Sequence, residues 1–415
     1  MGDPRIKRVT QCRGCRGGHL ERVLSLGSTP LANAFLREED LGKPEPSFPL
    51  ELLFCNDCTL VQLADVVSPE VLFRDYVYVS STSPVFVAHF EEFSAEVCRR
   101  FGLRQESLVV DIGSNDGILL RPYLSRGMRV LGIDPATRIA EQATRSGIET
   151  KGTFFSASLA EEIVRSKGAA AVVTATSVFP HVDDLDDLVG GVRRLLADDG
   201  VFLIEAYYLG DLLEKNLFDT IYHEHLSYFS IRTIVSTLAR LGMQVFDVQK
   251  TETHGGSLRV FAQKAGGPRP VEAAVERLLG DEARHDLASP STYTAFGQRI
   301  EGNKAALVAL LRRLKGEGAR IAGYGAPAKG NTLLNCFQIG ADLLDYIVDD
   351  SPWKQGLYTP GTHVRVESAE RLKRDPPQYL LLLAWNFAES IMKKCAAFKE
   401  TGGRFVIPVP APQVI

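Results

Sequence analysis

The sequence lacks long apolar runs, low-complexity tracts and any large excess of charge of one sign. Its 415 residues carry a formal net charge of −4, which gives no electrostatic reason to expect nucleic acid or an anionic membrane as a partner. No stretch is apolar enough to span a bilayer, and the start, MGDPRIKRVT, has no apolar signal region. We therefore expect a cytoplasmic protein without membrane attachment, either a monomer or a weak oligomer.

The length of the chain exceeds what one ordinary hydrophobic core accommodates. Apolar runs alternate with helical patterns twice, which is typical of mostly parallel α/β sheets. We predict an α/β fold with four parts, and after about residue 230 a helix and two strands that complete the first sheet. The parts are a cysteine-rich region (1–70), a Rossmann-like α/β domain (71–270), a helical connector (271–316) and a second Rossmann-like domain (317–415).

Four of the seven cysteines form two C-x2-C pairs, Cys12 with Cys15 and Cys55 with Cys58. Two such pairs can supply the four thiolates of a tetrahedral structural zinc site. A redox pair needs only one C-x-x-C at a helix start. The gap between the pairs is longer than in compact zinc ribbons, so unligated cysteines are the remaining alternative. We predict a structural Zn²⁺, because four thiolates leave no open position.

The segment VVDIGSNDG places a glycine turn directly after an apolar strand. Glycine lets the backbone approach a ligand, and Asp111 at the strand end can hold an ammonium group. Asp134 closes the next strand, where an acid can bind ribose hydroxyls. A dinucleotide site would favour G-x-G-x-x-G, so the pattern favours S-adenosylmethionine (SAM) over NAD. Together with the later turn TATSVFPHVDD, the predicted SAM-binding residues are Asp111, Gly113, Asn115, Asp116, Asp134 and Ser177.

The segment FDTIYHEHLSYFS crowds three kinds of titratable side chain into Tyr222, His223, Glu224 and His225. His223 and His225 would share one face of an extended segment and could bind a metal ion. The motif is not H-E-x-x-H, in which helical spacing makes two histidines converge. A metal site, a polar turn and an acid–base site all remain open from these residues alone.

Two glycine loops in the second half of the chain are candidates for phosphate binding. GYGAPAKGNT precedes a helix and carries a lysine, and THGGSLR carries an arginine that can bind phosphate through two donors. A dinucleotide site that uses Asp349 is the alternative for the first loop, and a plain hairpin turn is the alternative for the second. The candidate substrate-binding residues are Tyr324, Lys329, Asn331, His254 and Arg259.

Taken in order, these segments resemble the C-methyltransferases that act on nucleotide-linked keto-deoxysugars in antibiotic pathways. That family combines a cysteine-rich zinc region, a class I SAM domain with DIGSNDG-, VFPHV- and YHEHLSYFS-type segments, and a Rossmann-like domain that opens with GYGAPAKGNTLLN. The resemblance spans nearly the whole chain. It is closest to the C-3′-methyltransferases of dTDP-3-amino-4-keto sugars, the group that includes the enzyme of the tetronitrose pathway.

The resemblance implies SAM-dependent methylation of the carbon α to the ketone, at C-3′ of a dTDP-linked 3-amino-4-keto-deoxysugar. It places the reaction centre at Tyr222, Glu224 and His225, with His181 and Tyr76 lining the same cavity. A histidine suits the base and a phenol suits the enolate oxygen. We assign His225 as the base and Tyr222 as the donor to the keto oxygen, while Glu224 orients His225 or holds a substrate amine.

The resemblance also implies that the last domain helps to bind the diphosphate of the sugar nucleotide, with Lys329 close to it. Two other functions are consistent with parts of the sequence. An NAD-dependent oxidoreductase acting on a nucleotide sugar would use the C-terminal fold. A regulator that binds SAM without catalysis would use the first α/β domain alone.

Overall fold

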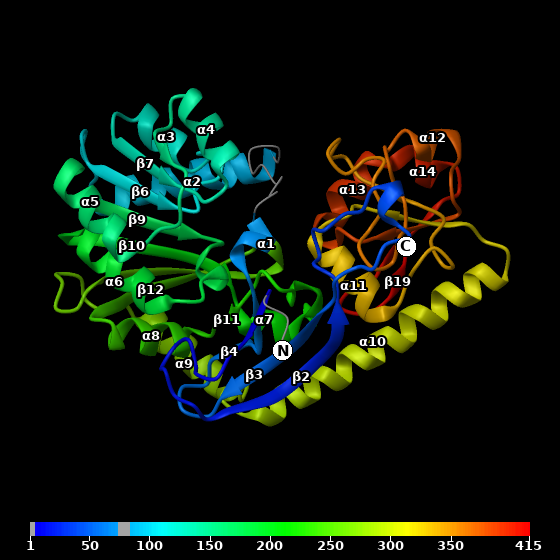
Figure 1. Cartoon of the computed structure of the whole chain (residues 1–415), viewed down its shortest axis with the longest axis horizontal. Helices are drawn as coiled ribbons and strands as arrows, with labels where there is room; N and C mark the ends of the chain where they lie inside the picture. The colour runs from blue at the N-terminus through cyan, green and yellow to red at the C-terminus, as the bar shows by residue number, and fades with distance from the viewer. Residues whose placement is uncertain (1–4, 74–83) are drawn as a thin grey trace.

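The computed structural model describes residues 5–73 and 84–415, which form two lobes joined by N-terminal strands and one long helix (Figure 1). The long helix is α10 (Pro290–Gly316), which runs along the base of the molecule from its middle to the C-terminal lobe. Among the described residues, no helix is both long enough and apolar enough to cross a membrane.

The first lobe is built on a seven-stranded sheet with the order β12-β13-β10-β9-β6-β7-β8. The strands β10, β9, β6, β7 and β8 run parallel, whereas β13 is antiparallel to both of its neighbours. The predicted helix and two strands after residue 230 therefore do complete this sheet. The bounds are β6 Leu108–Ile112, β7 Arg129–Ile133, β8 Thr150–Lys151, β9 Ala170–Thr176, β10 Leu196–Tyr207, β12 Met243–Thr251 and β13 Ser257–Lys264.

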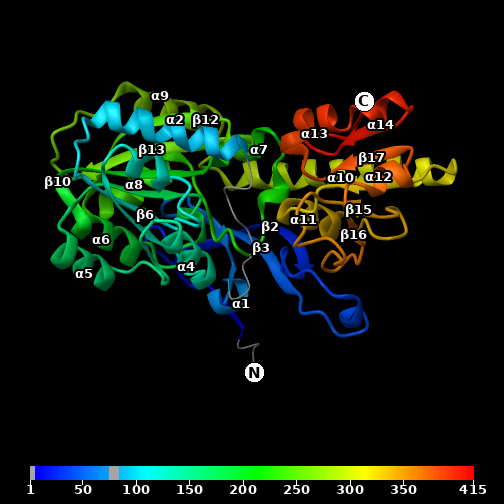
Figure 2. The same ribbon diagram turned by 90° about the horizontal axis from the view of Figure 1, so that it is seen from above.

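Helices cover both faces of this sheet, because successive strand residues point to opposite sides. Val110 packs with α5, α6 and α8 on one face, and Val109 packs with α2 and α3 on the other. Figure 2 shows α2 on one side of the sheet and α5 and α6 on the opposite side. The helix bounds are α2 Pro84–Phe101, α3 Leu120–Ser125, α4 Thr137–Arg145, α5 Ala157–Lys167, α6 Leu185–Leu195 and α8 Ile231–Arg240.

The C-terminal lobe has a six-stranded sheet with the order β16-β15-β14-β17-β18-β19, in which only the pair β18–β19 is antiparallel. Helix α11 (Ala328–Phe337) follows β14 directly, as the glycine loop predicts. The strand bounds are β14 Ile321–Tyr324, β15 Ile347–Val348, β16 Val366–Glu367, β17 Tyr379–Leu382, β18 Arg404–Ile407 and β19 Gln413–Val414. The other helices are α12 Arg371–Arg374, α13 Ala388–Lys394 and α14 Ala396–Glu400.

The N-terminal strands form a four-stranded sheet with the order β11-β4-β3-β2, while β1 pairs with β5 beside it. β11 (Ser227–Tyr228) follows the YHEH motif after one residue and pairs with β4, so the strand next to this motif belongs to the N-terminal sheet and not to the seven-stranded sheet. The remaining bounds are β1 Ile6–Arg8, β2 Leu20–Thr29, β3 Phe48–Cys55, β4 Val61–Leu63, β5 Asp65–Val67, α1 Pro69–Phe73, α7 Leu209–Glu214 and α9 Ala273–Arg284.

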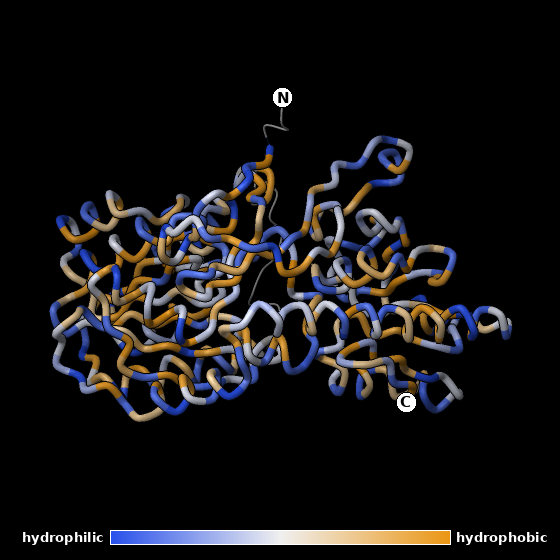
Figure 3. Tube along the Cα trace, turned by 90° about the horizontal axis from the view of Figure 1, so that it is seen from below, coloured by the Kyte–Doolittle hydropathy of each residue, from blue (hydrophilic) through white to orange (hydrophobic). Residues whose placement is uncertain are grey.

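One hydrophobic core connects the N-terminal sheet with the C-terminal lobe. It combines Phe54 of β3 and Ile221 beside the YHEH motif with Leu307 of α10 and Leu333 of α11. Figure 3 shows hydrophobic segments running through the interior of both lobes, with hydrophilic segments on the outer loops. Because β11 and α7 lie between the lobes in Figure 1, the YHEH motif is held where the parts of the chain meet.

Candidate active site

The four paired cysteines converge at the edge of the N-terminal sheet. Their Sγ atoms all lie within 4.8 Å of one another, and this is the only such metal-ligand group among the described residues. Sγ of Cys12 is 3.4 Å from that of Cys58, and Sγ of Cys15 is 3.6 Å from that of Cys55. Tetrahedral thiolates about 2.3 Å from a zinc ion lie roughly 3.8 Å apart, so the four residues fit a structural Zn²⁺.

Arg13, inside the first cysteine pair, connects the cysteine site to two segments of the candidate active site. Its buried guanidinium donates to the carboxylate of Asp183 at 2.9 Å and to the backbone carbonyl of Leu226 at 3.2 Å. The N–H of Leu226 donates in turn to the carbonyl of Pro180, at 2.7 Å. The cysteine site is thus tied to both the FPHV turn and the YHEH motif.

The turn after β6 is shaped for close approach of a ligand to the backbone. Gly113 has φ +73°, and a Cβ there would lie 2.1 Å from a methyl group of Val178, so only glycine fits. The Asp134 carboxylate accepts from the N–H groups of Asn115 and Ala136, at 2.8 Å each, and so joins the turns after β6 and β7.

Asp111 ends the same strand as a buried carboxyl group whose hydrogen-bond partner is the hydroxyl of Thr174, at 2.5 Å. Burial raises the pKa of Asp111 to about 7, against the effect of the Thr174 hydrogen bond. In the part of the chain that the structure describes, Asp111 forms no ion pair with a basic side chain, and a buried acid of this kind suits the ammonium group of SAM. Asp116 lies buried in the same turn, and the N–H of Ser177, after β9, donates to the carbonyl of Glu205 at 2.7 Å.

His225 lies at the centre of an aromatic group formed by the YHEH motif and its neighbours. The ring centroids of Tyr222, Tyr207 and His181 lie 4.0, 4.8 and 4.9 Å from that of His225. Nδ1 of His225 lies 2.6 Å from the carbonyl oxygen of Thr220, which can only accept, so Nδ1 carries the proton. In the neutral ring Nε2 then has the lone pair that a general base requires.

Two further titratable groups of the predicted centre are shifted by burial. Glu224 is buried and accepts from the amide of Asn33 at 2.7 Å, and burial raises its pKa to about 7 against the effect of Asn33. Burial lowers the pKa of His181 to about 4, opposed by hydrogen bonds with the backbone of Ser177 and Glu224. His181 is therefore neutral near pH 7 and joins the candidate cofactor turn to the YHEH motif.

His223 contacts a different part of the molecule from His225. Its Nε2 atom lies 3.2 Å from the carbonyl oxygens of both Phe48 and Pro49 in β3, and burial lowers its pKa. The two histidines of the motif thus contact different backbone segments, and the contacts of His223 with β3 attach the motif to the N-terminal sheet.

Lys329, in the first turn of α11, is buried beside the same aromatic group. Its ammonium lies over the rings of Tyr207 and Trp385, at 5.4 and 5.2 Å from their centroids. Burial lowers the pKa of Lys329 to about 8, against the effect of the nearby Asp219. Asp219 is itself fully buried, with a pKa raised to about 6, and accepts from Nε1 of Trp385 at 2.6 Å. Tyr207 thus connects Lys329 to His225.

The other predicted substrate-binding residues lie in separate surroundings. The Tyr324 hydroxyl donates to Asp350 at 3.1 Å, and the Asn331 amide donates to the carbonyl of Ala32 at 2.7 Å. Arg259 is buried in β13, where its guanidinium pairs with Glu205 at 2.9 Å and with Glu96 at 3.1 Å. Tyr76 and the side chain of His254 lie outside the described residues.

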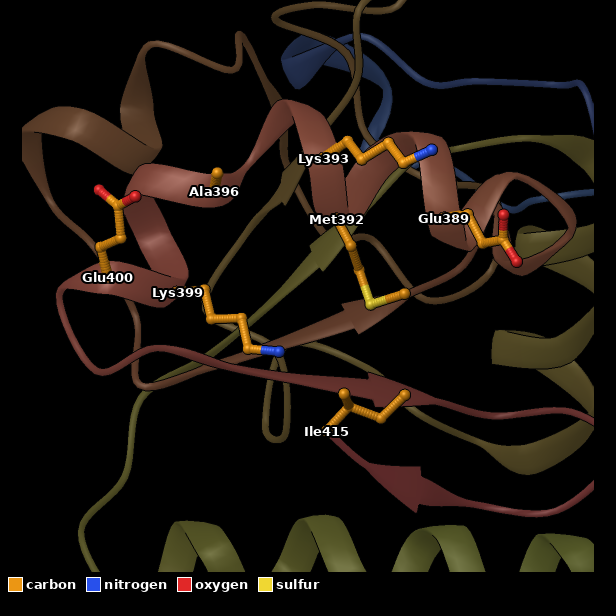
Figure 4. Close-up of a pocket in the computed structure, with 7 residues that line it drawn as sticks. All are labelled: Glu389, Met392, Lys393, Ala396, Lys399, Glu400 and Ile415. Carbon is orange, nitrogen blue, oxygen red and sulfur yellow. The ribbon is translucent and has the colours of Figure 1, made fainter.

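Five residues that the sequence analysis did not single out belong to this site: Arg13, Asn33, Tyr207, Asp219 and Trp385. Tyr207 and Trp385 lie at or just after the carboxyl ends of parallel strands, the edge where α/β sheets bind ligands, so that rule could have found them. Asn33 has no such signal, because it lies in a loop far from Glu224 in the chain. A surface hollow lined by Met392, Lys399 and Ile415 (Figure 4) contains none of the candidate site residues.

The strand order, the glycine turn after β6 and the acids at the ends of β6 and β7 define a class I SAM-dependent methyltransferase. Three family models match the chain: "Putative zinc binding domain" over residues 12–73, "Methyltransferase domain" over 87–248 and "C-methyltransferase C-terminal domain" over 252–410. The C-methyltransferase NovU of Streptomyces niveus is 38% identical over 410 residues, covering 99% of this chain and 98% of that protein. The chain belongs to this family of C-methyltransferases.

Two other similarities are confined to part of the chain. A ubiquinone biosynthesis O-methyltransferase of Rhodopseudomonas palustris (strain BisB5) is 30% identical over 115 residues, which is 26% of this chain and 45% of that protein. The crystal structure of a 1,6-didemethyltoxoflavin-N1-methyltransferase from Burkholderia thailandensis, with S-adenosylhomocysteine bound, covers 50% of this chain and 97% of its own, with 19% identity and a TM-score of 0.36.

These findings confirm the predicted fold class, the methyltransferase family, SAM as the cofactor and the zinc-binding cysteines. The protein is a SAM-dependent C-methyltransferase, so the NAD-dependent oxidoreductase and the non-catalytic regulator are set aside. The roles of the individual site residues and the four-part division of the chain stay predictions.

Proposed function

We propose that the protein methylates the carbon α to the ketone of a dTDP-linked 4-keto-deoxysugar, at C-3′ of a 3-amino sugar in antibiotic sugar biosynthesis. The observation that carries the proposal is the hydrogen bond of His225 Nδ1 to the Thr220 carbonyl, which leaves a basic Nε2 beside Tyr222. Carbon methylation next to a ketone requires such a base, because the α-proton must leave before the carbon can act as a nucleophile.

In this proposal His225 Nε2 takes the α-proton, and the electron pair of the C–H bond forms an enolate. The Tyr222 hydroxyl donates a hydrogen bond to the enolate oxygen, which stabilises the negative charge that develops there. SAM, when bound, would supply the methyl group: the S–CH3 bond would break as the new C–C bond forms, and S-adenosylhomocysteine would leave. Asp111 holds the ammonium group of SAM, and Asp134 accepts from its ribose hydroxyls.

The sugar nucleotide is proposed to bind between the two lobes, where the YHEH motif and α11 meet. Lys329 supplies positive charge there and is our candidate for the diphosphate. His181, neutral and hydrogen-bonded to both Ser177 and Glu224, supports the side of the cavity between cofactor and substrate. A closed, partly apolar surrounding strengthens each of these electrostatic contacts.

Incubation with methyl-labelled SAM and a panel of dTDP-4-keto sugars tests the proposal, with product masses read for the gain of one methyl group. The same sugars in deuterated water without SAM should exchange their α-proton, since proton removal precedes transfer. If no keto sugar gains a methyl group, the proposed substrate class is wrong.

The role of His225 is tested by His225→Asn, which keeps the donor to Thr220 and removes the base. We expect turnover and α-proton exchange to fall at least about 100-fold, while calorimetry shows unchanged SAM affinity. His285→Asn, at an exposed histidine after α9, is the matched control and should behave as the unmodified protein. Near-full activity of His225→Asn would contradict the assignment of His225 as base.

A further inference from the structure

The ring of Tyr207 lies where three parts of the chain meet. Tyr207 is the last residue of β10 in the first lobe, and its ring centroid lies 4.8 Å from that of His225, in the motif beside the N-terminal sheet. The Lys329 ammonium, from α11 of the C-terminal lobe, lies over the same ring, 5.4 Å from its centroid. One side chain thus contacts both the candidate base and the candidate diphosphate-binding group.

The backbone fixes the position of this ring relative to His225. Tyr208, the residue after Tyr207, forms a bridge with Phe229, which follows the YHEH motif. The N–H of Leu209 donates to the carbonyl of Phe229 at 3.0 Å. The end of β10 and the chain that leaves the motif are therefore joined just beyond the contact of Tyr207 with His225, which holds the two rings together.

His225 becomes a buried cation when it takes the α-proton. It is only 2% exposed, and a buried positive charge is costly unless the surrounding groups stabilise it. The Thr220 carbonyl, 2.6 Å from Nδ1, supports the charge at one atom of the imidazole. Because Nε2 has to face the substrate, the remaining stabilisation has to come from groups that contact the ring itself.

Aromatic rings are the groups that contact the imidazole of His225. An electron-rich ring attracts a cation that lies within about 6 Å of its centroid. The rings of Tyr222 and Tyr207 both satisfy this distance, at 4.0 and 4.8 Å. Tyr222 is already assigned to the enolate oxygen, whereas Tyr207 has no part in the proposed function so far.

We propose that Tyr207 is a positioning residue for methyl transfer, whose ring orients the His225 imidazole and stabilises the imidazolium that forms when His225 takes the α-proton. This inference rests on the proposed function, in which His225 is the base. No bond to Tyr207 forms or breaks, and the proton stays on Nε2 until it leaves for solvent after methyl transfer. Loss of the ring therefore lowers the proton affinity of His225 and slows proton removal.

Other titratable groups lie around His225 on the elements packed near it. They are Tyr222 and Glu224 of the motif, Tyr228 of β11, His181 of the FPHV turn, and Lys329 with Asp219 beyond Tyr207. His181 is neutral near pH 7, while Lys329 and Asp219 carry opposite charges there. All these groups remain when Tyr207 is replaced, so a comparison of two replacements, one with a ring and one without, reports the ring alone.

Tyr207→Phe keeps the ring and Tyr207→Leu removes it, so this pair of variants provides the test. The titration midpoint of His225 is measured by NMR on the zinc-loaded full chain with labelled histidine, and His225→Asn identifies its signal. The strength of a cation–π contact corresponds to about 0.4–1.5 pH units. The midpoint should fall by this amount in Tyr207→Leu and should stay unchanged in Tyr207→Phe.

The pH dependence of kcat provides a second readout. In Tyr207→Leu the pH of half-maximal kcat should fall by the same amount as the titration midpoint. The maximum should be at least about tenfold lower, because the base is weaker and less well oriented. Tyr207→Phe should restore both quantities. A loss of packing alone would lower kcat without moving its pH dependence.

Tyr208→Leu is the matched control for the loss of a ring. Tyr208 is buried and also has a lysine ammonium over its ring, that of Lys250 at 4.8 Å. This variant should lower the unfolding temperature but leave the titration midpoint of His225 unchanged. If Tyr207→Leu does not fold, Tyr207→Met takes its place. Equal midpoints in the variants with and without the ring, or an equal shift in Tyr208→Leu, would overturn the role of Tyr207.

The two kinds of measurement separate this inference from the proposed function. If the unmodified protein methylates no keto sugar, the proposed function fails, while the titration of His225, measured without substrate, still tests the ring contact. If keto sugars are methylated but Tyr207→Leu changes neither the titration midpoint nor the pH dependence of kcat, only the role of Tyr207 fails.

Discussion

At the scale of single residues, the burial of the Asp111 carboxyl group costs stability, and we expect this residue to bind the cofactor. Its pKa is about 7 in the folded chain and near 3.8 when unfolded, so between these values the folded state holds more protons. The free energy of unfolding therefore falls as pH rises from about 4 to 7. Each tenfold change in proton affinity between the two states corresponds to about 1.4 kcal/mol. The unfolding temperature of Asp111→Asn should therefore fall less between pH 5 and pH 8 than that of the unmodified protein. The variant should also bind SAM more weakly.

The measurement is thermal unfolding without ligands at both pH values, together with SAM calorimetry at pH 8. Asp199→Asn, at an exposed aspartate, should reproduce the pH dependence and the SAM affinity of the unmodified protein. If the unfolding temperature of Asp111→Asn depends on pH as strongly as that of the unmodified protein, the Asp111 carboxyl group does not have the raised pKa that its burial implies.

A functional residue can be predicted from the sequence only when its neighbours in the chain form a recognisable motif. The zinc ligands and Asp111 stand in short motifs whose spacing reports their chemistry. Asn33 donates to a carboxylate 191 residues away, and Trp385 donates to one 166 residues away. Such pairs form only when separate segments pack together, so no local pattern in a single sequence indicates them.

At the scale of elements, Arg13 connects the cysteine site to the FPHV turn and the YHEH motif, so we expect the cysteine site to influence catalysis through Arg13. In Arg13→Lys, a single ammonium group replaces the rigid guanidinium. It cannot donate at the same time to Asp183 and to the backbone carbonyls that Arg13 contacts. We expect kcat to fall at least about tenfold, because His225 would be displaced, while zinc content and SAM affinity stay the same. Steady-state kinetics, metal analysis and calorimetry measure the three quantities.

Arg16→Lys is the matched control, since Arg16 lies beside the same cysteine pair but forms more exposed ion pairs with Asp184 and Asp186. Exposed ion pairs contribute about 1 kcal/mol or less, so this variant should retain near-full activity. If Arg13→Lys and Arg16→Lys are equally active, Arg13 does not position the catalytic segments.

The path of the YHEH motif shows where sequence patterns stop being informative about elements. The sequence predicts the apolar strands of the seven-stranded sheet, because an apolar run that ends in a turn and is followed by a helical pattern is a recognisable signal. β11 contains only Ser227 and Tyr228, and two residues have no measurable period. Its pairing with β4 is therefore visible only in the structure, although this pairing attaches the motif to the cysteine-rich region.

At the scale of the whole molecule, the N-terminal sheet packs against both lobes. Its strands β3 and β4 contribute to the core that also contains α10 and α11, and β4 pairs with β11 after the YHEH motif. Phe218, just before the motif, stacks on Phe337 of α11 with ring centroids 4.7 Å apart. The distance between the candidate site residues of the two lobes thus depends on this small sheet, whose buried residues belong to a core shared with the C-terminal lobe.

Zinc removal should for this reason affect the whole enzyme rather than its first seventy residues alone. The N-terminal sheet buries residues such as Phe54 in the core that it shares with the C-terminal lobe, and a small region relies on its metal to hold its own shape. Without zinc the sheet should therefore loosen from β11 and α11. We expect a chelator to lower the unfolding temperature and to abolish methyl transfer together, with recovery on zinc addition but not on magnesium addition. Cys55→Ser should reproduce both losses, whereas Cys98→Ser, outside the zinc site, should retain activity. Full methyl transfer by protein shown to be zinc-free would contradict the structural coupling between the cysteine site and the active site.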